Sequence, residues 1–536
     1  MAGLIALLGV ALILCVVAFP TPNDISVGEM AYQKLWLGRM TVVFAVCCLP
    51  FLCLNKKQYL SFPSIVTWVL IILGGIEAIW GLRQIYGFAV SNHSLYALTG
   101  SFYNPGPYSG YLAMIFPLCL HEWLNLKEKT ERTWIEQGKY YMALGVMLLI
   151  LCVLPAGMSR SAWIAAVSGA WVYGMHISWG SKLKEIRKIY KRKVVLACIA
   201  GSIIFIVIGY SLFQLKATSA NGRLFMWKIS TLAIAESPLI GHGTGNFVSA
   251  YGRAQESYFA NEEYSETEEL VAGSPECAFN EYLQVATEYG IPFLFVVLLI
   301  IAFCLWKGSR EGRIGLCGGI IAVLVFAFSS YPMQIPGFAV TFYFLLAACV
   351  IGRSKIMLLF FISIIILLGA YYWKNNQYDA CKNWYRSKML YNIGAYQSAK
   401  EEYETLYPEL KNRGAFLFEY GYCLHKLKQY DSSTVVLEEA MKHSCDPMLL
   451  NIIGKNYQAV GKYEKAEESL IRSTHRLPGR IYPYYLLAKL YAEPEYQQPE
   501  KLKRMVEVVL TKEPKVQSTA VKEMRVEVKK LLKQIN

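Results

Sequence analysis

The chain has 536 residues, of which 55% are hydrophobic and only 17% are charged, and its formal net charge is +14. Soluble domains carry about 25% charged residues, so this composition excludes a protein that is soluble throughout, and it equally excludes a disordered or collagen-like chain. The basic residues lie largely in short connections between apolar runs, which is typical of a membrane protein rather than of a nucleic-acid-binding one.

Up to about residue 376, apolar runs long enough to span a membrane recur along the chain. A helix needs about 20 apolar residues to cross about 30 Å of hydrocarbon. We therefore expect about eleven spans, at residues 1–19, 36–55, 64–86, 107–122, 140–157, 160–178, 193–214, 284–306, 313–330, 336–351 and 355–373. The first run lacks the basic start and the cleavage site of a signal peptide, so we expect it to be retained. The predicted fold of residues 1–376 is an all-α polytopic membrane bundle.

Basic residues also predict the orientation of this bundle, because positively charged connections face the cytoplasm. Alternate connections are basic, as around Lys127, Lys184 and Lys307, whereas those between them carry few basic residues. The longest of the latter, residues 215–283, is rich in glutamate, and we expect it to be an extracytoplasmic loop. An odd number of spans then places the segment after residue 376 outside the cytoplasm as well.

From Gly394 onward the sequence repeats with a period of 33–34 residues. The turn Gly394-Ala-Tyr396 recurs as Lys428-Gln-Tyr430 and Gly461-Lys-Tyr463. Small residues recur at matching helix positions, namely Gly421, Gly454 and Ala488, and then Ala399, Ser433 and Ala466. This pattern resembles the tetratricopeptide repeat, a helix-turn-helix unit. We expect residues 377–536 to form an extracytoplasmic α-solenoid that binds a protein partner.

Five short polar motifs lie on the side that we expect to face outward. They are Gly100-Ser-Phe-Tyr-Asn104-Pro105, Ser159-Arg160-Ser161-Ala162, Gly222-Arg223 with Trp227, a glycine loop at 237–247 that contains His242, and Asn280-Glu281-Tyr282-Leu283-Gln284. Each also has a structural interpretation, because an arginine at a span end serves as an interfacial anchor and glycines serve turns. Glu77 and Arg83 of span 64–86 are either functional or a pair that holds the bundle together.

In this order the motifs resemble those of the O-antigen ligase family, polytopic bacterial glycosyltransferases, over roughly residues 65–350. The resemblance implies transfer of a glycan from an undecaprenyl-diphosphate carrier to a lipid A core, a growing glycan or a protein hydroxyl. It places this reaction at the outer face of the bacterial cytoplasmic membrane and implies neither a metal nor a cofactor. The 14 cysteines agree, because they include no CxxC pair and no Cys/His spacing typical of a metal site.

Two arginines suit the chemistry that this resemblance implies. The departing diphosphate gains charge in the transition state, and Arg matches phosphate with two parallel hydrogen bonds. Preorganised cations at a developing anion often contribute most to catalysis. The resemblance points to Arg160 in S-R-x-A and Arg223 in G-R-x-x-x-W, which we predict clamp the diphosphate. The predicted substrate contacts are Asn104, Trp227, Asn280, Gln284 and Arg83, and weaker substitutes for the clamp are Arg253 and Lys228.

The general base departs from the family pattern. Family members usually have His directly before the Asn of the last motif, but this chain has Phe279, which cannot accept a proton. The base must therefore lie elsewhere, be unnecessary or be missing. Glu281 and His242 are equally ranked candidates for a base, which needs hydrogen-bond reach to the acceptor, and we expect Glu288 to be structural.

The resemblance leaves ligase, polymerase and protein O-oligosaccharyltransferase open, and we predict ligase-like transfer. Alternatives of another class are a lipid-linked glycan transporter and an inactive scaffold that presents the repeats. Transporters bind near the membrane midplane, often with inverted repeats, whereas the motifs here lie at one face. Phe279 favours the inactive scaffold, because phenylalanine cannot accept the proton of the acceptor hydroxyl. The expected partners are the lipid-linked donor, the acceptor, membrane lipids and a protein bound by the repeats, but no nucleic acid.

Overall fold

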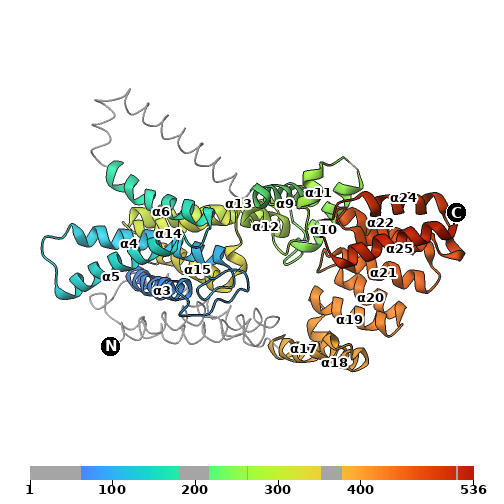
Figure 1. Cartoon of the computed structure of the whole chain (residues 1–536). Coiled ribbons are helices and arrows are strands. Elements are labelled where there is room, and N and C mark those ends of the chain that lie inside the picture. Colours follow the sequence, from blue (N-terminus) through green and yellow to red (C-terminus); the bar gives the residue numbers. More distant parts are fainter. Residues whose placement is uncertain (1–61, 180–216, 262, 352–376, 515–516, 536) are drawn as a thin grey trace. The chain divides into compact units, whose positions relative to one another are not determined.

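The computed structural model describes residues 62–179, 217–261, 263–351, 377–514 and 517–535. Within these ranges the regular elements are all helices, with no strand, as the all-α prediction requires (Figure 1). Four predicted spans, 1–19, 36–55, 193–214 and 355–373, lie outside the described residues. The described chain divides into two compact units. Within the described residues, unit 1 comprises 62–179, 279–282, 295–351 and 377–378, and unit 2 comprises 217–261, 263–278, 283–294, 379–514 and 517–535.

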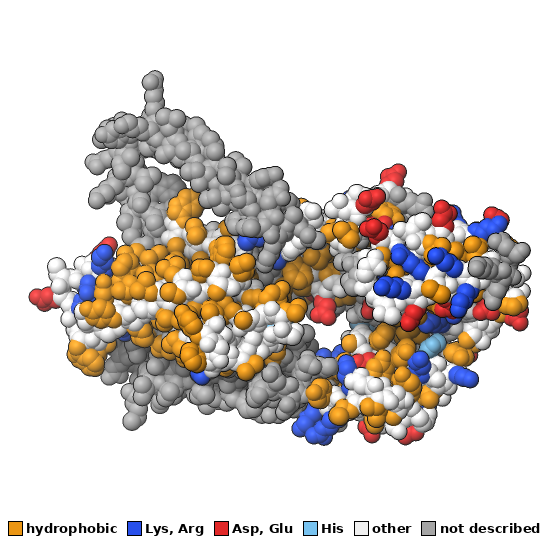
Figure 2. Space-filling model, viewed as in Figure 1, with side chains coloured by type: hydrophobic (Ala, Val, Ile, Leu, Met, Phe, Trp, Pro, Cys, Tyr) orange, Lys and Arg blue, Asp and Glu red, His pale blue; other side chains and the backbone are white. Residues whose placement is uncertain are grey.

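Unit 1 is a bundle of apolar helices. Its elements are α3 (Phe62–Ile85), α4 (Pro105–Lys127), α5 (Trp134–Val153), α6 (Arg160–Trp179), α13 (Ile291–Arg310, of which the first four residues belong to unit 2), α14 (Ile314–Ala327), η2 (Pro332–Gln334) and α15 (Pro336–Val350). Small residues let these helices approach closely, as is usual where lipid supplies no hydrophobic drive. A side-chain carbon added at Gly318 of α14 lies 2.7 Å from the carbonyl oxygen of Gly169 in α6. Hydrophobic side chains cover much of the visible surface of this bundle (Figure 2).

Three described helices are long and apolar enough to cross a membrane, namely α3, α5 and α13. Helices α4, α6, α14 and α15 lie at four further predicted spans, 107–122, 160–178, 313–330 and 336–351. The count of eleven spans stays a prediction. The predicted boundary at residue 284 is wrong, because a separate helix, α12 (Glu281–Tyr289), precedes Gly290, whose φ of +85° breaks the helix before α13 begins.

Unit 2 begins with the segment that we expected to be a long extracytoplasmic connection between two spans, and the described part of this segment is largely helical. It contains α9 (Ala217–Glu236), α10 (Phe247–Ala260), α11 (Glu266–Val271) and most of α12. The repeats follow as α17 (Gln377–Asn392), α18 (Tyr396–Leu410), α19 (Gly414–Lys426), α20 (Tyr430–Ala440), α21 (Pro447–Ala459), α22 (Tyr463–Arg476), α23 (Ile481–Tyr491), η3 (Pro494–Tyr496), α24 (Pro499–Thr511) and α25 (Thr519–Ile535).

The repeats pack as helix pairs that stack on one another, and their small residues explain the packing (Figure 1). A side-chain carbon added at Gly421 of α19 lies 2.6 Å from the Leu437 side chain of α20, and the same addition at Gly454 of α21 lies 2.8 Å from Leu470 of α22. The three predicted turns also match, because Gly394, Lys428 and Gly461 all have positive φ, at +81°, +61° and +74°. Lys, Arg, Asp and Glu side chains are scattered over the visible face of the repeats in Figure 2.

Candidate functional site

The glycine loop (237–247) is built on the turn between α12 and α13. The amides of His242 and Gly243 donate to the carbonyls of Thr287 and Glu288, at 2.9 and 2.8 Å. The amide of Ile291, the first residue of α13, donates to the carbonyl of Pro238 at 2.8 Å. The polar loop is therefore fixed to the start of a membrane-length helix.

Two glycines make this close approach possible. A side-chain carbon added at Gly241 lies 2.4 Å from the Glu288 backbone, and one added at Gly290 lies 2.3 Å from the Leu239 carbonyl oxygen. Both residues also have positive φ, +68° and +85°, which residues with a side chain rarely adopt. The glycines thus serve backbone packing, which was the structural interpretation of this motif.

The carboxylate of Glu288 lies at the N-terminus of α10. It accepts hydrogen bonds from the backbone amides of Gly245 and Phe247 and, at 2.7 Å, from the Gln284 side chain. Burial raises the pKa of Glu288, while these hydrogen bonds favour its charged form. Amides at a helix N-terminus bind anions readily. Here the chain supplies that anion itself, and Glu288 ties α10 to α12.

His242 has both ring nitrogens engaged. Its Nε2 lies 2.7 Å from the carbonyl oxygen of Ala233, which only accepts, so Nε2 carries the proton. Its Nδ1 then accepts from Arg253 of α10 at 3.4 Å, and the same guanidinium donates to Ser249 at 2.7 Å. Arg253 itself is exposed. In this arrangement the Nδ1 lone pair, which His242 would need to act as a base, already accepts from the Arg253 guanidinium.

The last motif forms the start of α12. The Asn280 side chain accepts from the Tyr282 amide at 3.0 Å, and Gln284 accepts from the Ala278 amide at 2.9 Å. Both substrate-contact candidates are buried. Glu281 is also buried and accepts from the Met333 amide at 2.7 Å and from the Gln334 side chain at 3.3 Å. A carboxylate has about four acceptor positions, so these bonds do not exclude a further partner.

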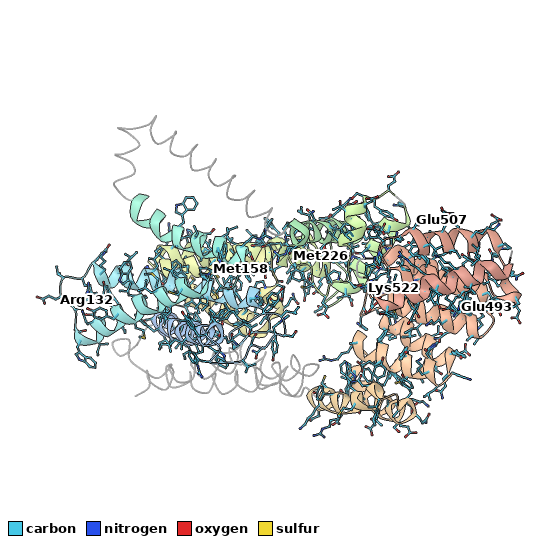
Figure 3. The ribbon with its side chains drawn as sticks, viewed as in Figure 1. Arg132, Met158, Met226, Glu493, Glu507 and Lys522 are labelled. Atoms are coloured by element: carbon cyan, nitrogen blue, oxygen red, sulfur yellow. The ribbon has the colours of Figure 1, made fainter. Side chains whose placement is uncertain are left out.

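Phe279, which stands where the family usually has His, has an unusual backbone conformation. Its φ is +49°, a region that bulky side chains rarely occupy. Its ring meets that of Tyr331 edge to face, with 4.9 Å between the centroids. Met158, which is labelled in Figure 3, lies directly before the Ser159-Arg160 motif. Its φ is also +49°. Backbone strain directly before two of the predicted motifs is a signal that sequence patterns do not carry.

The motif around Asn104 is held by α3. Asn104 caps α4 by accepting from the Gly106 amide at 2.9 Å. Glu77 is fully buried and accepts from the Ser101 amide at 3.1 Å, and Gln84 accepts from the Gly100 amide at 2.7 Å. Arg83 is exposed and donates to the Phe88 carbonyl at 3.4 Å. Glu77 thus holds a turn, and Gln84 is a positioning residue that sequence reasoning missed.

The predicted clamp arginines lie in different units. Arg160 begins α6 in unit 1, and Arg223 lies in the second turn of α9 in unit 2. Both are half-buried, as is Trp227 one turn after Arg223. Their approach to one diphosphate stays a prediction. Lys228 is ion-paired with Glu268 at 2.6 Å and donates to Tyr258 at 2.7 Å, so it is not simply solvated.

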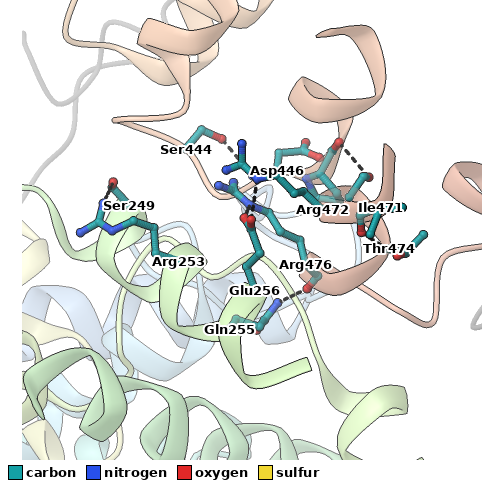
Figure 4. Close-up of polar contacts among 12 residues, drawn as sticks. Ser249, Arg253, Gln255, Glu256, Ser444, Asp446, Ile471, Arg472, Thr474 and Arg476 are labelled. Carbon is teal, nitrogen blue, oxygen red and sulfur yellow. Dashed lines mark hydrogen bonds and ion pairs between the residues drawn. The ribbon is translucent and has the colours of Figure 1, made fainter. Parts of the chain in front are cut away.

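Helix α10 also contacts the solenoid (Figure 4). Glu256 of α10 is ion-paired with two arginines of α22, Arg472 at 2.7 Å and Arg476 at 2.9 Å. The Gln255 side chain donates to the Arg476 carbonyl. The backbones also approach closely, because a side-chain carbon added at Gly252 would lie 2.7 Å from the Cβ atom of Cys445. No sequence motif pointed to this contact. It fixes the helix that carries Arg253.

Acidic, His and Cys side chains do not gather into a metal site within the described residues: no group of three or more could hold an ion. The described chain is a helical membrane protein with a polar loop at the start of one apolar helix and a repeat solenoid attached.

Residues 145–298 match the family model described as O-Antigen ligase. This confirms the predicted resemblance over a range that contains Arg160, Arg223, the glycine loop and Glu281, and it supports a glycan ligase- or polymerase-type function.

Two other comparisons add little. Among solved structures, "Crystal structure of APC/C hetero-tetramer Cut9-Hcn1" matches with 11% identity over 95% of each chain and a TM-score of 0.25. So low a score carries no inference. No curated protein matches the chain.

Proposed function

We propose that this chain transfers a sugar or oligosaccharide from an undecaprenyl-diphosphate carrier to an acceptor hydroxyl at the outer face of the bacterial cytoplasmic membrane. The observation that carries the proposal is that the family match covers a polar loop whose backbone is bonded to Ile291, the first residue of a membrane-length helix. The first residue of a spanning helix lies near the membrane–water boundary, and the diphosphate of a lipid-linked donor lies at the same level. The donor and the polar loop can therefore meet without extraction of the lipid from the bilayer.

In the proposed reaction the acceptor oxygen attacks the anomeric carbon while the bond from that carbon to the diphosphate oxygen breaks. The diphosphate leaves with the bonding electron pair, the acceptor proton passes to a base, and the anomeric centre is inverted. Arg160 and Arg223 are proposed to stabilise the charge on the departing diphosphate. Arg253, which is exposed beside His242, is a third cation for this purpose.

Glu281 is the better candidate for the base. For His242 to accept a proton at Nδ1, it must first lose its hydrogen bond from Arg253. Glu281 accepts hydrogen bonds from the Met333 amide and the Gln334 side chain, neither of which is a cation, and a carboxylate can take up a proton while it accepts such bonds. We propose Glu281 as base and His242 as the residue that orients Arg253.

An inactive scaffold is the second candidate function, because Phe279 replaces the usual His and both nitrogens of His242 are engaged. Purified protein in nanodiscs, given a polyprenyl-diphosphate glycan, distinguishes the two. Transfer to a lipid A core, a free glycan or a peptide identifies ligase, polymerase or protein transferase. Absence of transfer to all three acceptors would contradict the proposed enzymatic function and favour the scaffold.

Variants test the residues in the same assay. We expect Arg160→Ala and Arg223→Ala each to lower kcat about 100-fold, the usual effect of removing one oxyanion partner. Arg480→Ala, at an exposed position of the solenoid, is the matched control and should leave the rate unchanged. Full turnover of the Arg160/Arg223 double variant would disprove the clamp.

A further inference from the structure

Four large apolar residues gather where the glycine loop meets α13. Leu239 is 72% exposed, Ile240 81%, Ile291 51% and Phe293 47%. We treat them as one patch because the backbone brings the loop and the helix start together: the Ile291 amide donates to the Pro238 carbonyl, and a side-chain carbon added at Gly290 would lie 2.3 Å from the Leu239 carbonyl oxygen. Single exposed apolar residues are ordinary, but a contiguous patch indicates a binding surface. We name these four residues the apolar tip.

The length of α13 gives the depth of this tip. Its 20 residues span about 30 Å, which is the thickness of the hydrocarbon core. At its far end the Arg310 guanidinium lies 4.8 Å from the Trp306 ring, and Lys307 lies beside them. Trp and basic residues of this kind mark a membrane–water boundary. Ile291 therefore lies at the opposite boundary, and the loop bonded to it lies there too.

We infer that the apolar tip enters the outer edge of the bilayer and holds the glycine loop at the level of the lipid headgroups. The occupant of this surface is the phospholipid bilayer, because the patch continues directly into the lipid-facing side of α13, most of which is not buried inside the protein. Tyr289, whose ring packs on that of Phe293 at 4.9 Å, lies where aromatic residues line membrane boundaries.

The consequence concerns the donor, and it rests on the proposed function. His242 follows Ile240 by two residues and contacts Arg253, so the tip brings both polar groups to headgroup depth. A polyprenyl diphosphate that diffuses in the leaflet then reaches them laterally. A donor with a short, water-soluble tail does not need the tip.

Photo-crosslinking tests the membrane contact without reference to activity. A genetically encoded photo-crosslinking residue at Ile240, in the full chain in phospholipid nanodiscs, should form lipid adducts about as often as one at Leu299 within α13. The matched control is Val435, which is 65% exposed on the charged helix α20 and should form few adducts. Adducts at residue 240 no more frequent than at residue 435 would overturn the inference.

Kinetics then test the consequence. We expect Leu239→Asp with Ile240→Asp to lower kcat/KM for a long-chain donor about tenfold or more, because charged residues leave the apolar edge. Turnover of a short-chain donor should stay unchanged, as should both rates in Val435→Asp. Equal losses with both donors would contradict a membrane role. If the unaltered chain uses neither donor, the proposed function fails. The crosslinking result still shows whether the apolar tip contacts the bilayer.

Discussion

At the scale of single residues, the most informative position is Phe279. Its left-handed backbone costs about 1–3 kcal/mol for a residue with a side chain, and the surrounding structure must supply that energy. It also occupies the position at which the resemblance leads us to expect a base. His tolerates this backbone conformation better than most residues and keeps an aromatic ring for Tyr331.

We therefore expect Phe279→His to raise the transfer rate, and to add to its pH profile a limb that rises through about pH 6.5, where an unperturbed imidazole loses its proton. The measurement is kcat/KM from pH 5 to 8. Phe279→Tyr is the control, since it keeps the ring but has no base at neutral pH. A pH profile identical to that of the parent would show that this position no longer faces the acceptor.

Lys428 has the same kind of strain in the solenoid, but here the chain offers an internal comparison. The equivalent turn residues of the neighbouring repeats are Gly394 and Gly461. Lys428→Gly should therefore stabilise the solenoid by about 1 kcal/mol, since glycine adopts positive φ without a steric cost. A rise of a few degrees in the melting temperature of the full chain checks this. Gly461→Lys should lower it, and shifts of the same sign would contradict the explanation.

At the scale of elements, the contact between α10 and α22 shows how a charged cluster fixes a helix. Arg476 is only 3% exposed, so its guanidinium depends on the Glu256 carboxylate. Burial raises the pKa of Glu256, but the hydrogen bonds from Arg472 and Arg476 outweigh burial and lower it overall. The ionised carboxylate therefore stabilises this contact at neutral pH. That contribution is lost as the pH falls below the ordinary range of a glutamate.

Glu256→Ala leaves a buried cation without its partner, and we expect the contact to lose about 2–4 kcal/mol. Hydrogen exchange of the full chain should then show faster exchange in both α10 and α22. Glu439→Ala removes an exposed pair with Lys442 and should cost less than about 1 kcal/mol. Unchanged protection of α10 in the Glu256 variant would mean that apolar packing, such as that at Gly252, suffices.

At the scale of the whole molecule, what could be predicted were the features that repeat locally. Apolar runs indicated helices in unit 1, and the period of 33–34 residues indicated the helix pairs of the solenoid, down to the turn at Lys428. Asn280 and Gln284 could be singled out by their motif. Their hydrogen bonds to Tyr282 and Ala278 could not, because these depend on the fold around the start of α12.

Features that depend on distant residues escaped prediction. Glu256 and Arg476 are 220 positions apart, and no local pattern joins them. The segment 215–283 lacks a long apolar run, so the sequence indicated only a connection between two spans and gave no sign that its helix α10 packs on the solenoid. Glu288 accepts hydrogen bonds from the backbone amides of Gly245 and Phe247, and a sequence does not show which backbone amides a side chain will reach. The mutual position of Arg160 and Arg223 stays a prediction.

The docking of α10 on α22 also imposes an order on biosynthesis. A ribosome makes Glu256 220 residues before it makes Arg476, and nascent proteins fold from the N-terminus as domains are completed. During synthesis, helix α10, which carries Arg253, therefore has no ion-pair partner for its Glu256 carboxylate until nearly the last repeats have been translated. A prematurely terminated chain has every sequence motif of the polar loop but lacks the frame that holds it.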